Sequence, residues 1–537
     1  MNLAWWLERA AWEWPEKTAI VSADGSRCTY QELHRTTDRL AAFFRDRCDV
    51  STDEVVVALL PDDHVHVAAF YATMKIGGVF TSLSRIQEIE RLIQTVRTCR
   101  SRTLVTVREH LETAENIFAQ TSLERLVVLD ETVVQDGHRL GAYDVLTSED
   151  PVDVRIVPRS NDDLAAVNFT SGTTGPGKGV KFTHGSLGAS ALATVFWHGI
   201  KSSDVNLACI SMFHSGGIHD AVKWVLAGAT QIWMGGWDRD RMADLIEQER
   251  PTWIYFLVPT MVRDLMSSPR WETLPVGGVK TNLSGEAVPA ALQQELLDRG
   301  MRPVNAFGMT ETMPVGVLVP PLYYDADREA PAGSSGRPNR EFCEVRLVDP
   351  HSGNLVTDPG HEGEIQIRGD VVTPGYLDPD DDARSFTADG WLCTKDLAHF
   401  DEDGFYWVGG RTDEVINSGA EKLSLVEVEE TLRSSPIVAD VACIGADHER
   451  FGQCAAAFVA TTEPMTSAEV RDALNTHCLA TMERWKRPRL YVVVDEVPRT
   501  YPKRNKNIGA LRNAVAGIKV PNTPNPVTME EIEVTNA

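Results

Sequence analysis

The sequence of 537 residues lacks several features that would assign it to a common class of protein. Its nine cysteines are dispersed and include no C-x-x-C pair, which argues against a structural zinc site or a dithiol redox motif. No apolar run approaches the roughly 18 residues that span a bilayer, and the acidic, proline-containing start does not resemble a signal peptide. An odd, dispersed set of thiols is typical of a reducing compartment, so we expect a cytoplasmic protein with no membrane partner.

Positive charge is also scarce. The chain has 52 basic and 77 acidic residues, which gives a net charge of -25. This balance disfavours nucleic acid as a partner, and a polyanionic ligand must therefore be met by local positive charge and a metal. The contents of hydrophobic (43%) and charged (24%) residues are ordinary for a globular protein. The length predicts more than one domain.

The most informative segment that the chain does contain is TSGTTGPGKGV, at residues 170–180, directly after an apolar stretch at 164–169 that is predicted to be a buried strand. Glycines let the backbone turn tightly and bring its N–H groups against an anion, so we predict a phosphate-binding loop. It is not a Walker loop, because Gly179 stands where that motif has a magnesium-binding hydroxyl. The candidate phosphate-binding residues are Thr170, Ser171, Gly172, Thr173, Thr174 and Lys178.

The order of the predicted elements indicates an α/β fold. Alternating helix and strand patterns up to about residue 335 favour mostly parallel sheets with helices on their faces. From about residue 336 to 412 short strands and turns predict a β-rich subdomain, and residues 413–520 form a compact α+β unit of domain size. We expect residues 521–537 to be a disordered tail and the acidic stretch at 378–383 to be a solvated turn.

Seven further motifs follow the order found in one superfamily. They are TYQEL (29–33), MFHSGG (212–217), LSGEAVP (283–289), NAFGMTET (305–312), GEIQIRGDVVTPGY (363–376), DGWLCTKD (389–396) and GRTDEVINSGAEKLSLVEVEE (410–430). With the phosphate loop, they resemble the ANL superfamily of adenylate-forming enzymes, which contains acyl- and aryl-CoA synthetases, peptide-synthetase adenylation domains and beetle luciferases. The resemblance covers nearly the whole chain and is greatest to the acyl-CoA synthetases.

This resemblance implies a large N-terminal adenylation domain over residues 1–412 and a small mobile lid over residues 413–520, hinged near Asp413. It implies a ligase in which a carboxylic acid and MgATP give an acyl-adenylate and pyrophosphate, after which coenzyme A takes the acyl group. Transfer to a carrier-protein thiol or a partner enzyme, with weak or absent thioesterification of coenzyme A, stays open as the alternative. The resemblance also allows a homodimer.

The resemblance assigns roles to single residues. Glu311 is the expected magnesium ligand, Thr310 beside it contacts the α-phosphate, and His214 in the F-H-x-x-G motif gates the carboxylate pocket. Asp396 and Arg411 hold the ribose hydroxyls, since a carboxylate accepts from both hydroxyls and arginine fixes its geometry. The adenine side is formed by Gly285, Glu286, Ala287, Asn305, Ala306, Phe307 and Gly308, with Phe307 stacking on the base.

The chain departs from the superfamily pattern at several positions, three of which concern the expected site. The late catalytic lysine should follow Thr500 by four residues, but Arg504 stands there, so Lys503 and Lys506 are both candidates and Lys503 is preferred as a one-residue slip. Ala420 follows Gly419 where thioester-forming relatives have a second glycine, and its methyl group is predicted to crowd the thiol tunnel. Lys395 stands where relatives usually have glycine.

The substrate is expected to be a hydrophobic or aromatic carboxylic acid. Amino-acid-activating relatives carry an aspartate near the position of His214 and Ser215, so an α-amino acid is disfavoured. Five tryptophans fall in the segment expected to wall the acyl pocket, most of them as core and one or two as pocket walls. They are Trp197, Trp224, Trp233, Trp237 and Trp253.

Overall fold

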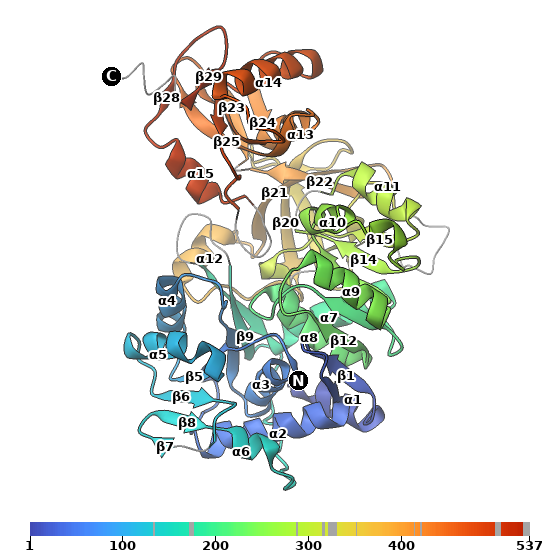
Figure 1. Ribbon diagram of the computed structural model, residues 1–537, viewed down its shortest axis with the longest axis vertical. Helices are drawn as coiled ribbons and strands as arrows, with labels where there is room; N and C mark the ends of the chain where they lie inside the picture. Colours follow the sequence, from blue (N-terminus) through green and yellow to red (C-terminus); the bar gives the residue numbers. More distant parts are fainter. Residues whose placement is uncertain are drawn as a thin grey trace.

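The computed structural model describes residues 1–132, 135–170, 177–285, 288–313, 317–319, 330–350, 352–412, 414–418, 421–499 and 506–529. The chain forms an elongated molecule in which two large mixed α/β layers occupy one end and a smaller α+β unit occupies the other (Figure 1). The β-rich part lies between them.

The first large sheet has seven strands, which are parallel except for the antiparallel pair formed by β1 and β2 at one edge. In spatial order the strands are β15 (Arg302–Asn305), β14 (Lys280–Leu283), β13 (Trp253–Leu257), β11 (Val205–Ala208), β12 (Thr230–Trp233), β1 (Thr18–Val21) and β2 (Arg27–Thr29).

The second large sheet has eight strands, with antiparallel pairs only at its two edges, where β10 pairs with β9 and β7 with β8. The strand from 164 to 169 that the sequence predicts is confirmed as β9. In spatial order the strands are β10 (Gly179–Thr183), β9 (Leu164–Phe169), β4 (Val79–Ser82), β3 (Val55–Leu59), β5 (Thr103–Thr106), β6 (Arg125–Val128), β8 (Arg139–Gly141) and β7 (Gln135–Asp136).

Helix α8 (Ser215–Ala227) lies between the two sheets, next to α7 (His184–His198). Ile218, Ala221 and Val222 belong to the core that includes the second sheet, whereas Trp224 belongs to the core of the first. Every residue of α8 from Ser215 to Val225 is buried. A helix that is covered on all sides in this way carries its polar side chains into the interior of the protein.

Three of the remaining helices of this part, α2, α3 and α9, begin at a residue whose side chain caps them. The TYQEL motif is a capping box: the Thr29 hydroxyl accepts from the Glu32 N–H, while the Glu32 carboxylate accepts from the Thr29 N–H. The helices are α1 (Ala4–Glu13), α2 (Tyr30–Asp46), α3 (His64–Lys75), α4 (Ile89–Cys99), α5 (Leu111–Ala119), α6 (Tyr143–Thr147), α9 (Arg239–Glu249), α10 (Pro259–Met266) and α11 (Ala290–Asp298).

The β-rich part is an antiparallel sheet in the order β19 (Leu355–Val356), β18 (Cys343–Val348), β20 (Gly363–Gly369), β21 (Leu392–Phe400) and β22 (Tyr406–Arg411). The acidic stretch expected to be a solvated turn is instead the start of helix α12 (Pro379–Ser385). The Asp378 carboxylate accepts from the Asp380 N–H, and Pro379 occupies the first turn. Acids near a helix N-terminus interact favourably with the helix dipole, which explains the acidic composition of this stretch.

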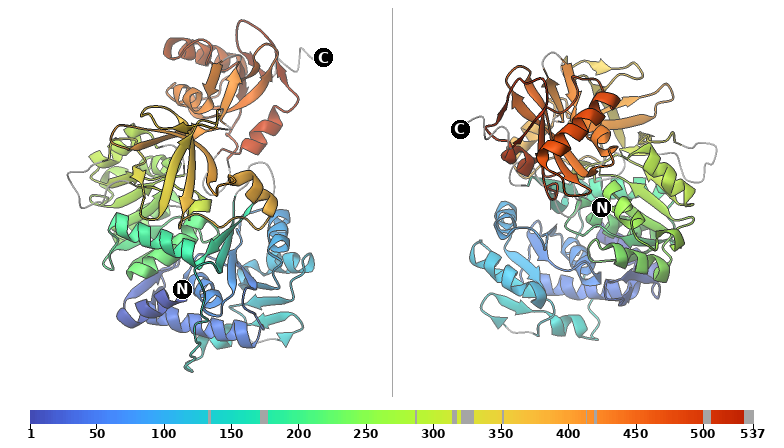
Figure 2. Two further views of the ribbon diagram at one scale, coloured as in Figure 1. Left: turned by 180° about the vertical axis from the view of Figure 1, so that it is seen from behind. Right: turned by 45° about the horizontal axis from the view of Figure 1, so that its top comes forward.

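The C-terminal unit is a twisted sheet covered on both faces, and Figure 2 shows it beyond the β-rich sheet from two further directions. Along β25 (Val438–His448), Val441 and Cys443 enter one core cluster while Ala442 and Ile444 enter the other. Its other elements are β23 (Val415–Ser418), β24 (Glu421–Ser424), β26 (Gly452–Thr461), β27 (Leu490–Val493), β28 (Lys519–Val520), β29 (Val527–Thr528), α13 (Leu425–Arg433), α14 (Ser467–Thr481) and α15 (Ile508–Ala514).

The tail expected from residue 521 onward begins with an ordered portion. Strand β29 pairs in parallel with β27, and the Arg487 guanidinium donates to the carbonyl of Pro524 at 2.6 Å. These contacts fix residues up to 529 against the sheet. The expected hinge residue Asp413 lies outside the described residues. In the part of the chain that the structure describes, no helix is long and apolar enough to cross a membrane.

Candidate functional site

The two ends of the phosphate loop are fixed by the hairpin of β9 and β10. The Thr170 N–H donates to the carbonyl of Lys178 at 3.0 Å, and the Lys178 N–H donates to the Thr170 hydroxyl at 3.2 Å. A Cβ atom at Gly177 would lie 2.3 Å from the carbonyl oxygen of Thr170, so the close approach of these ends requires glycine there. Ser171, Gly172, Thr173 and Thr174 lie outside the described residues.

The loop lysine is directed toward α12. The Lys178 ammonium lies 3.3 Å from the Ser385 hydroxyl and 3.4 Å from the Asp381 carboxylate. It also lies 4.8 Å from the ring centre of Tyr376, a cation–π distance. The Lys178 side chain remains 36% exposed, so an arriving phosphate can reach it.

The expected metal ligand lies next to this lysine. Glu311 belongs to the short 3-10 turn η3 (Thr310–Thr312) and is 7% exposed. Its carboxylate accepts from the Tyr376 hydroxyl at 2.8 Å, and its backbone carbonyl accepts from the Thr373 N–H at 2.8 Å. Burial raises the pKa of Glu311, whereas the Tyr376 hydrogen bond and the charges of Lys178 and Arg411 lower it.

Tyr376 is the residue of this cluster that the sequence analysis missed. Its hydroxyl holds Glu311 and its ring lies beneath Lys178, so one side chain joins the expected metal ligand to the phosphate loop. Tyr376 is the last residue of the GEIQIRGDVVTPGY motif, and this position was the sequence signal that could have identified it as a site residue. Its partner Glu311, however, lies 65 residues away in the sequence.

The donor set fits magnesium bound together with a nucleotide. Magnesium is commonly held by one or two carboxylates plus phosphate oxygens, and it keeps several of its waters. Among the described residues, no group of three or more His, Cys, Asp or Glu side chains could hold a metal ion. Glu311 would hold the ion, which would neutralise charge on the phosphates.

The start of α8 meets the same turn. The Thr310 hydroxyl lies 3.4 Å from the Ser215 hydroxyl, in the first turn of α8. His214 precedes that helix, is buried, and has its ring centre 4.2 Å from that of Phe213. The structure thus brings Thr310, His214 and the strand leading to the phosphate loop together, because the carbonyl of Phe213 accepts from the Asn168 side chain of β9.

The two residues expected to bind the ribose, Asp396 and Arg411, face each other on neighbouring strands. Asp396 on β21 and Arg411 on β22 are register partners, and the guanidinium lies 3.1 Å from the carboxylate. Their side chains are 14% and 39% exposed respectively, so both are accessible at the edge of the sheet. Lys395, which stands where relatives have glycine, adopts a φ of +64°. This left-handed conformation favours glycine.

The expected adenine-side residues are partly described. Gly285 follows β14 with a φ of +87°, and Glu286 and Ala287 lie outside the described residues. The Asn305 amide donates to the carbonyl of Gly333 at 3.2 Å, and Phe307 forms a backbone bridge with Leu318. Ala306 is buried and Gly308 is half-buried between them and η3.

The two late lysines have different surroundings. The Lys506 ammonium lies 2.8 Å from both the Glu414 and the Glu429 carboxylates, inside the C-terminal unit. Burial alone would lower the pKa of Lys506, but these two carboxylates outweigh it and raise the pKa. Lys503, Gly419 and Ala420 lie outside the described residues.

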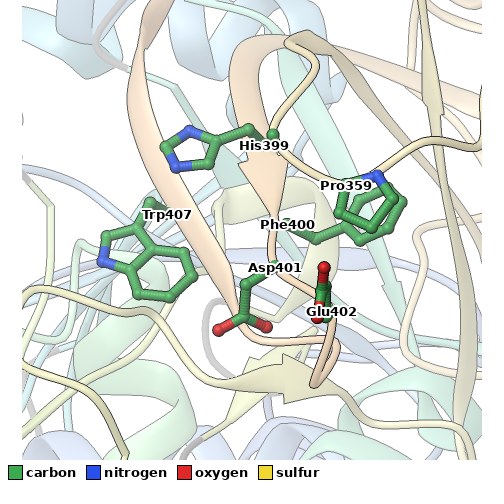
Figure 3. Close-up of a pocket in the computed structure, with 7 residues that line it drawn as sticks. Pro359, His399, Phe400, Asp401, Glu402 and Trp407 are labelled. Atoms are coloured by element: carbon green, nitrogen blue, oxygen red, sulfur yellow. The ribbon is translucent and has the colours of Figure 1, made fainter.

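A surface depression of about 370 Å³ lies on the β-rich sheet, away from this cluster (Figure 3). Trp407 and His399 stack there with ring centres 5.5 Å apart, and Asp401 and Glu402 form the adjoining rim. Two carboxylates at the rim would repel a polyphosphate, so this depression is not a suitable nucleotide site.

The five tryptophans do not form one wall. The ring centres of Trp224 on α8 and Trp253 on β13 lie 6.1 Å apart, and both rings pack with Tyr255. Trp233 belongs to the core that includes the second sheet, and the indole N–H groups of Trp197 and Trp237 donate to Asn339 and Asp264. Trp224 and Trp253 thus lie in the buried core of the first sheet.

Comparisons with known proteins match most of the chain to family models. The profile of the AMP-binding enzyme family matches residues 7–377, and the profile of the AMP-binding enzyme C-terminal domain matches residues 427–503. The chain is 31% identical to an indoleacetate–CoA ligase of Aromatoleum aromaticum, over 93% of this chain and 96% of that protein. It is 32% identical to a feruloyl-CoA synthase of an Amycolatopsis species, over 85% of this chain and 88% of that protein.

A solved structure shows the same architecture. The crystal structure of an anthranilate CoA ligase in complex with anthranoyl-AMP superimposes with a TM-score of 0.84 at 26% identity, and the match covers 96% of this chain and 97% of that one. The expected fold, a large α/β domain followed by a smaller α+β domain, is therefore confirmed.

Proposed function

The chain belongs to the AMP-binding enzyme family, and from this premise we propose that it joins an aromatic carboxylic acid to coenzyme A, at the expense of ATP. In the first step a carboxylate oxygen of the acid attacks the α-phosphorus of ATP, and pyrophosphate leaves with the electron pair of the broken P–O bond. In the second step the thiolate sulfur of coenzyme A attacks the acyl carbon and AMP leaves.

The observation that carries the proposal is the cluster of Glu311, Tyr376 and Lys178 at the turn that also contacts α8. Both reactants of the first step are anions, so the site must neutralise charge and hold them in line. Lys178 supplies a positive charge to the phosphates, and Glu311 is placed to hold the magnesium that accompanies them. Asp396 and Arg411 are accessible for the ribose hydroxyls.

The aromatic acid is the finer part of the proposal. Three relatives are named for indoleacetate, for a feruloyl group and for anthranilate, all of them aromatic. In this chain the rings of Trp224 on α8 and of Trp253 and Tyr255 on β13 pack together where α8 meets the first sheet. Flat rings pack well against such aromatic surfaces.

The test measures pyrophosphate release and AMP formation over a panel of aromatic, fatty and amino acids, with and without coenzyme A. We expect an aromatic acid to give the highest kcat/KM for pyrophosphate release, and coenzyme A to be consumed in step with AMP. A fatty acid or amino acid with the highest value would refute the substrate class. Adenylate formation without thioester would refute coenzyme A as the acceptor.

A further inference from the structure

The turn at residues 211–214 leads from β11 into α8 and ends at His214. Within the turn, the His214 N–H donates to the carbonyl of Ser211 at 3.0 Å. The next residue, Ser215, begins α8, and its hydroxyl lies 3.4 Å from that of Thr310. The conformation of this turn therefore determines where His214 and the start of α8 lie relative to Thr310, the residue expected at the α-phosphate.

Asp62, which follows β3 of the second sheet, holds this turn. Its Oδ1 accepts from the Ser211 hydroxyl at 2.8 Å and from the Met212 N–H at 2.9 Å. The Asp62 side chain is only 2% exposed, so water competes little for these two hydrogen bonds. Hydrogen bonds to an ionised carboxylate are stronger than those between neutral groups. One buried carboxylate thus fixes both a side chain and a backbone group of the turn.

The other oxygen of Asp62 takes part in a link between the two large sheets. Oδ2 accepts from the Arg85 guanidinium at 3.2 Å, and the same nitrogen of Arg85 donates to the carbonyl of Gly235 at 2.9 Å. Arg85 follows β4 of the second sheet, whereas Gly235 follows β12 of the first. All of these residues lie beyond the carboxyl ends of parallel strands, which is where open α/β sheets bind their ligands.

The segment that carries Asp62 is itself held firmly. The carboxylate of Asp63 caps α3 by accepting from the N–H groups of Val65 and His66 at 2.9 and 3.0 Å. Burial lowers the pKa of His66, and the carbonyl of Pro61 can only accept, so the neutral imidazole donates to it from Nδ1 at 3.1 Å. The position of the Asp62 carboxylate is therefore set by its own surroundings before any ligand binds.

The direction of its hydrogen bonds separates Asp62 from a carboxylate that serves stability alone. Of the three that its carboxylate accepts from described residues, two come from the turn before α8 and one from Arg85. Asp38 offers a comparison, because it also forms a buried ion pair beside α3, with Lys75, but this pair joins α2 to α3. A buried ion pair is in itself weak evidence for a contribution to stability.

We propose that Asp62 is a positioning residue for the adenylation step: by holding the turn at residues 211–214, it places His214 and the start of α8 so that the carboxylate of the acid meets the α-phosphorus in line. The inference rests on the proposed function. Asp62 acts through the turn and not on the reacting atoms. Its effect can nevertheless be large, because a misplacement of about 1 Å at a reacting group can cost about 100-fold in rate.

The first test removes the carboxylate. In Asp62→Ala, kcat/KM for the acid in pyrophosphate release should fall by about 10- to 100-fold, because hydrogen bonds to a charged group are lost. The affinity for MgATP, measured by isothermal titration, should change little. The matched control Asp38→Ala should lower the thermal unfolding midpoint and leave kcat/KM for the acid unchanged. An unchanged kcat/KM in folded Asp62→Ala, or an equal loss in both variants, would overturn the proposal.

The second test asks whether Asp62 acts through the turn. Asp62→Asn keeps an oxygen for Ser211 and Met212 but turns an NH₂ group toward Arg85, so it should recover most of the kcat/KM that Asp62→Ala loses. Ser211→Ala removes one donor from the other side of the contact. Combined with Asp62→Ala, it should cost less than the sum of the two single changes. Additive losses, or no recovery in Asp62→Asn, would overturn the proposal.

Hydrogen–deuterium exchange measures the contact itself without turnover. The peptide containing residues 209–215 should exchange faster in Asp62→Ala than in the wild type or in Asp38→Ala, because the Met212 N–H loses its acceptor. Unchanged exchange would overturn the role of Asp62, whatever the activity. The failure of the two proposals is therefore distinguishable. If the exchange rises as expected but the wild-type enzyme releases pyrophosphate with no acid, the proposed function fails and the contact between Asp62 and the turn stands.

Discussion

At the scale of the residue, Tyr376 connects the two groups that the first half-reaction depends on. Its hydroxyl restrains a buried carboxylate, and its ring supports the lysine of the phosphate loop. Neither contact places Tyr376 on the reacting atoms, so it is a positioning residue, and the effect of its removal should be found in nucleotide binding.

We predict that Tyr376→Phe raises the KM for MgATP by about tenfold or more, because Glu311 loses a hydrogen bond made to a charged group. The KM for the acid should change little, since Tyr376 faces Glu311 and Lys178. Steady-state kinetics at varied MgATP, with isothermal titration of the nucleotide, measures both. Tyr143→Phe, at an exposed tyrosine of α6, is the control. Unchanged nucleotide affinity would remove Tyr376 from this role.

The Glu311→Ala variant is expected to abolish adenylation, because the magnesium that accompanies the phosphates loses its protein anchor. The measurement is ATP–pyrophosphate exchange with the best acid, at magnesium concentrations up to saturation. Exchange at a near-native rate in this variant would show that Glu311 is not part of the mechanism.

Lys395 has a backbone conformation that is unfavourable for a residue with a side chain. A residue other than glycine in the left-handed region costs about 1–2 kcal/mol, and Lys395 has a φ of +64°. We predict that Lys395→Gly raises the free energy of unfolding by up to about 1 kcal/mol, because the greater flexibility of unfolded glycine offsets part of the gain. Urea denaturation tests this, and a clear loss of stability would contradict it.

At the scale of the element, the sequence was sufficient wherever local chemistry determines structure. The apolar stretch before the phosphate loop became β9, and Thr29 with Glu32 formed the cap of α2. The acidic stretch after Asp378 was misinterpreted, because a capping aspartate, a proline and several acids occur both in turns and at helix starts.

The contacts that the sequence did not predict are long-range. Tyr376 meets Glu311 across 65 residues, and no local pattern records that distance. Asp220 and Lys223 have the spacing of an ordinary pair on a helix surface, which usually faces solvent. Only the burial of α8 between two sheets turns this common pattern into an interior charge pair.

The surroundings of Lys506 give a prediction for the C-terminal unit. Two carboxylates hold Lys506, so Lys506→Met should destabilise the protein by about 3 kcal/mol, near the lower end for a buried pair because the side chain keeps 18% exposure. Lys503→Ala should instead lose adenylation with little change in stability.

Thermal unfolding and ATP–pyrophosphate exchange on the same two variants separate these roles. Conversion of supplied acyl-adenylate to thioester should survive in Lys503→Ala, because the proposed lysine acts only in the first half-reaction. If Lys506→Met remains fully stable and loses only exchange, the assignment of the two lysines is reversed.

At the scale of the whole molecule, buried histidines make stability depend on pH. Burial lowers the pKa of both His184 and His198 to about 3, and the Leu3 N–H donates to His184. The unfolded chain takes up these protons near pH 6.5, whereas the native protein does so only near pH 3. The free energy of unfolding therefore falls as the pH drops through this window, by roughly 2 kcal/mol for each histidine at pH 5.

The measurement is the urea midpoint between pH 7.5 and 5. His184→Gln should flatten the dependence relative to wild type, since glutamine does not titrate. An identical slope in the variant would show that His184 is protonated as easily in the native protein as in the unfolded chain.

The pairing of β29 with β27 has a practical consequence for anyone who shortens or tags this chain. β29 covers the outer side of β27, and the carbonyl of Pro524 anchors the approach to it through Arg487. Deleting residues from 521 onward would leave the N–H and C=O groups of β27 as a bare sheet edge, which is a template for pairing between molecules. Such a truncation should keep its nucleotide chemistry at high dilution, yet form oligomers and then precipitate as it is concentrated.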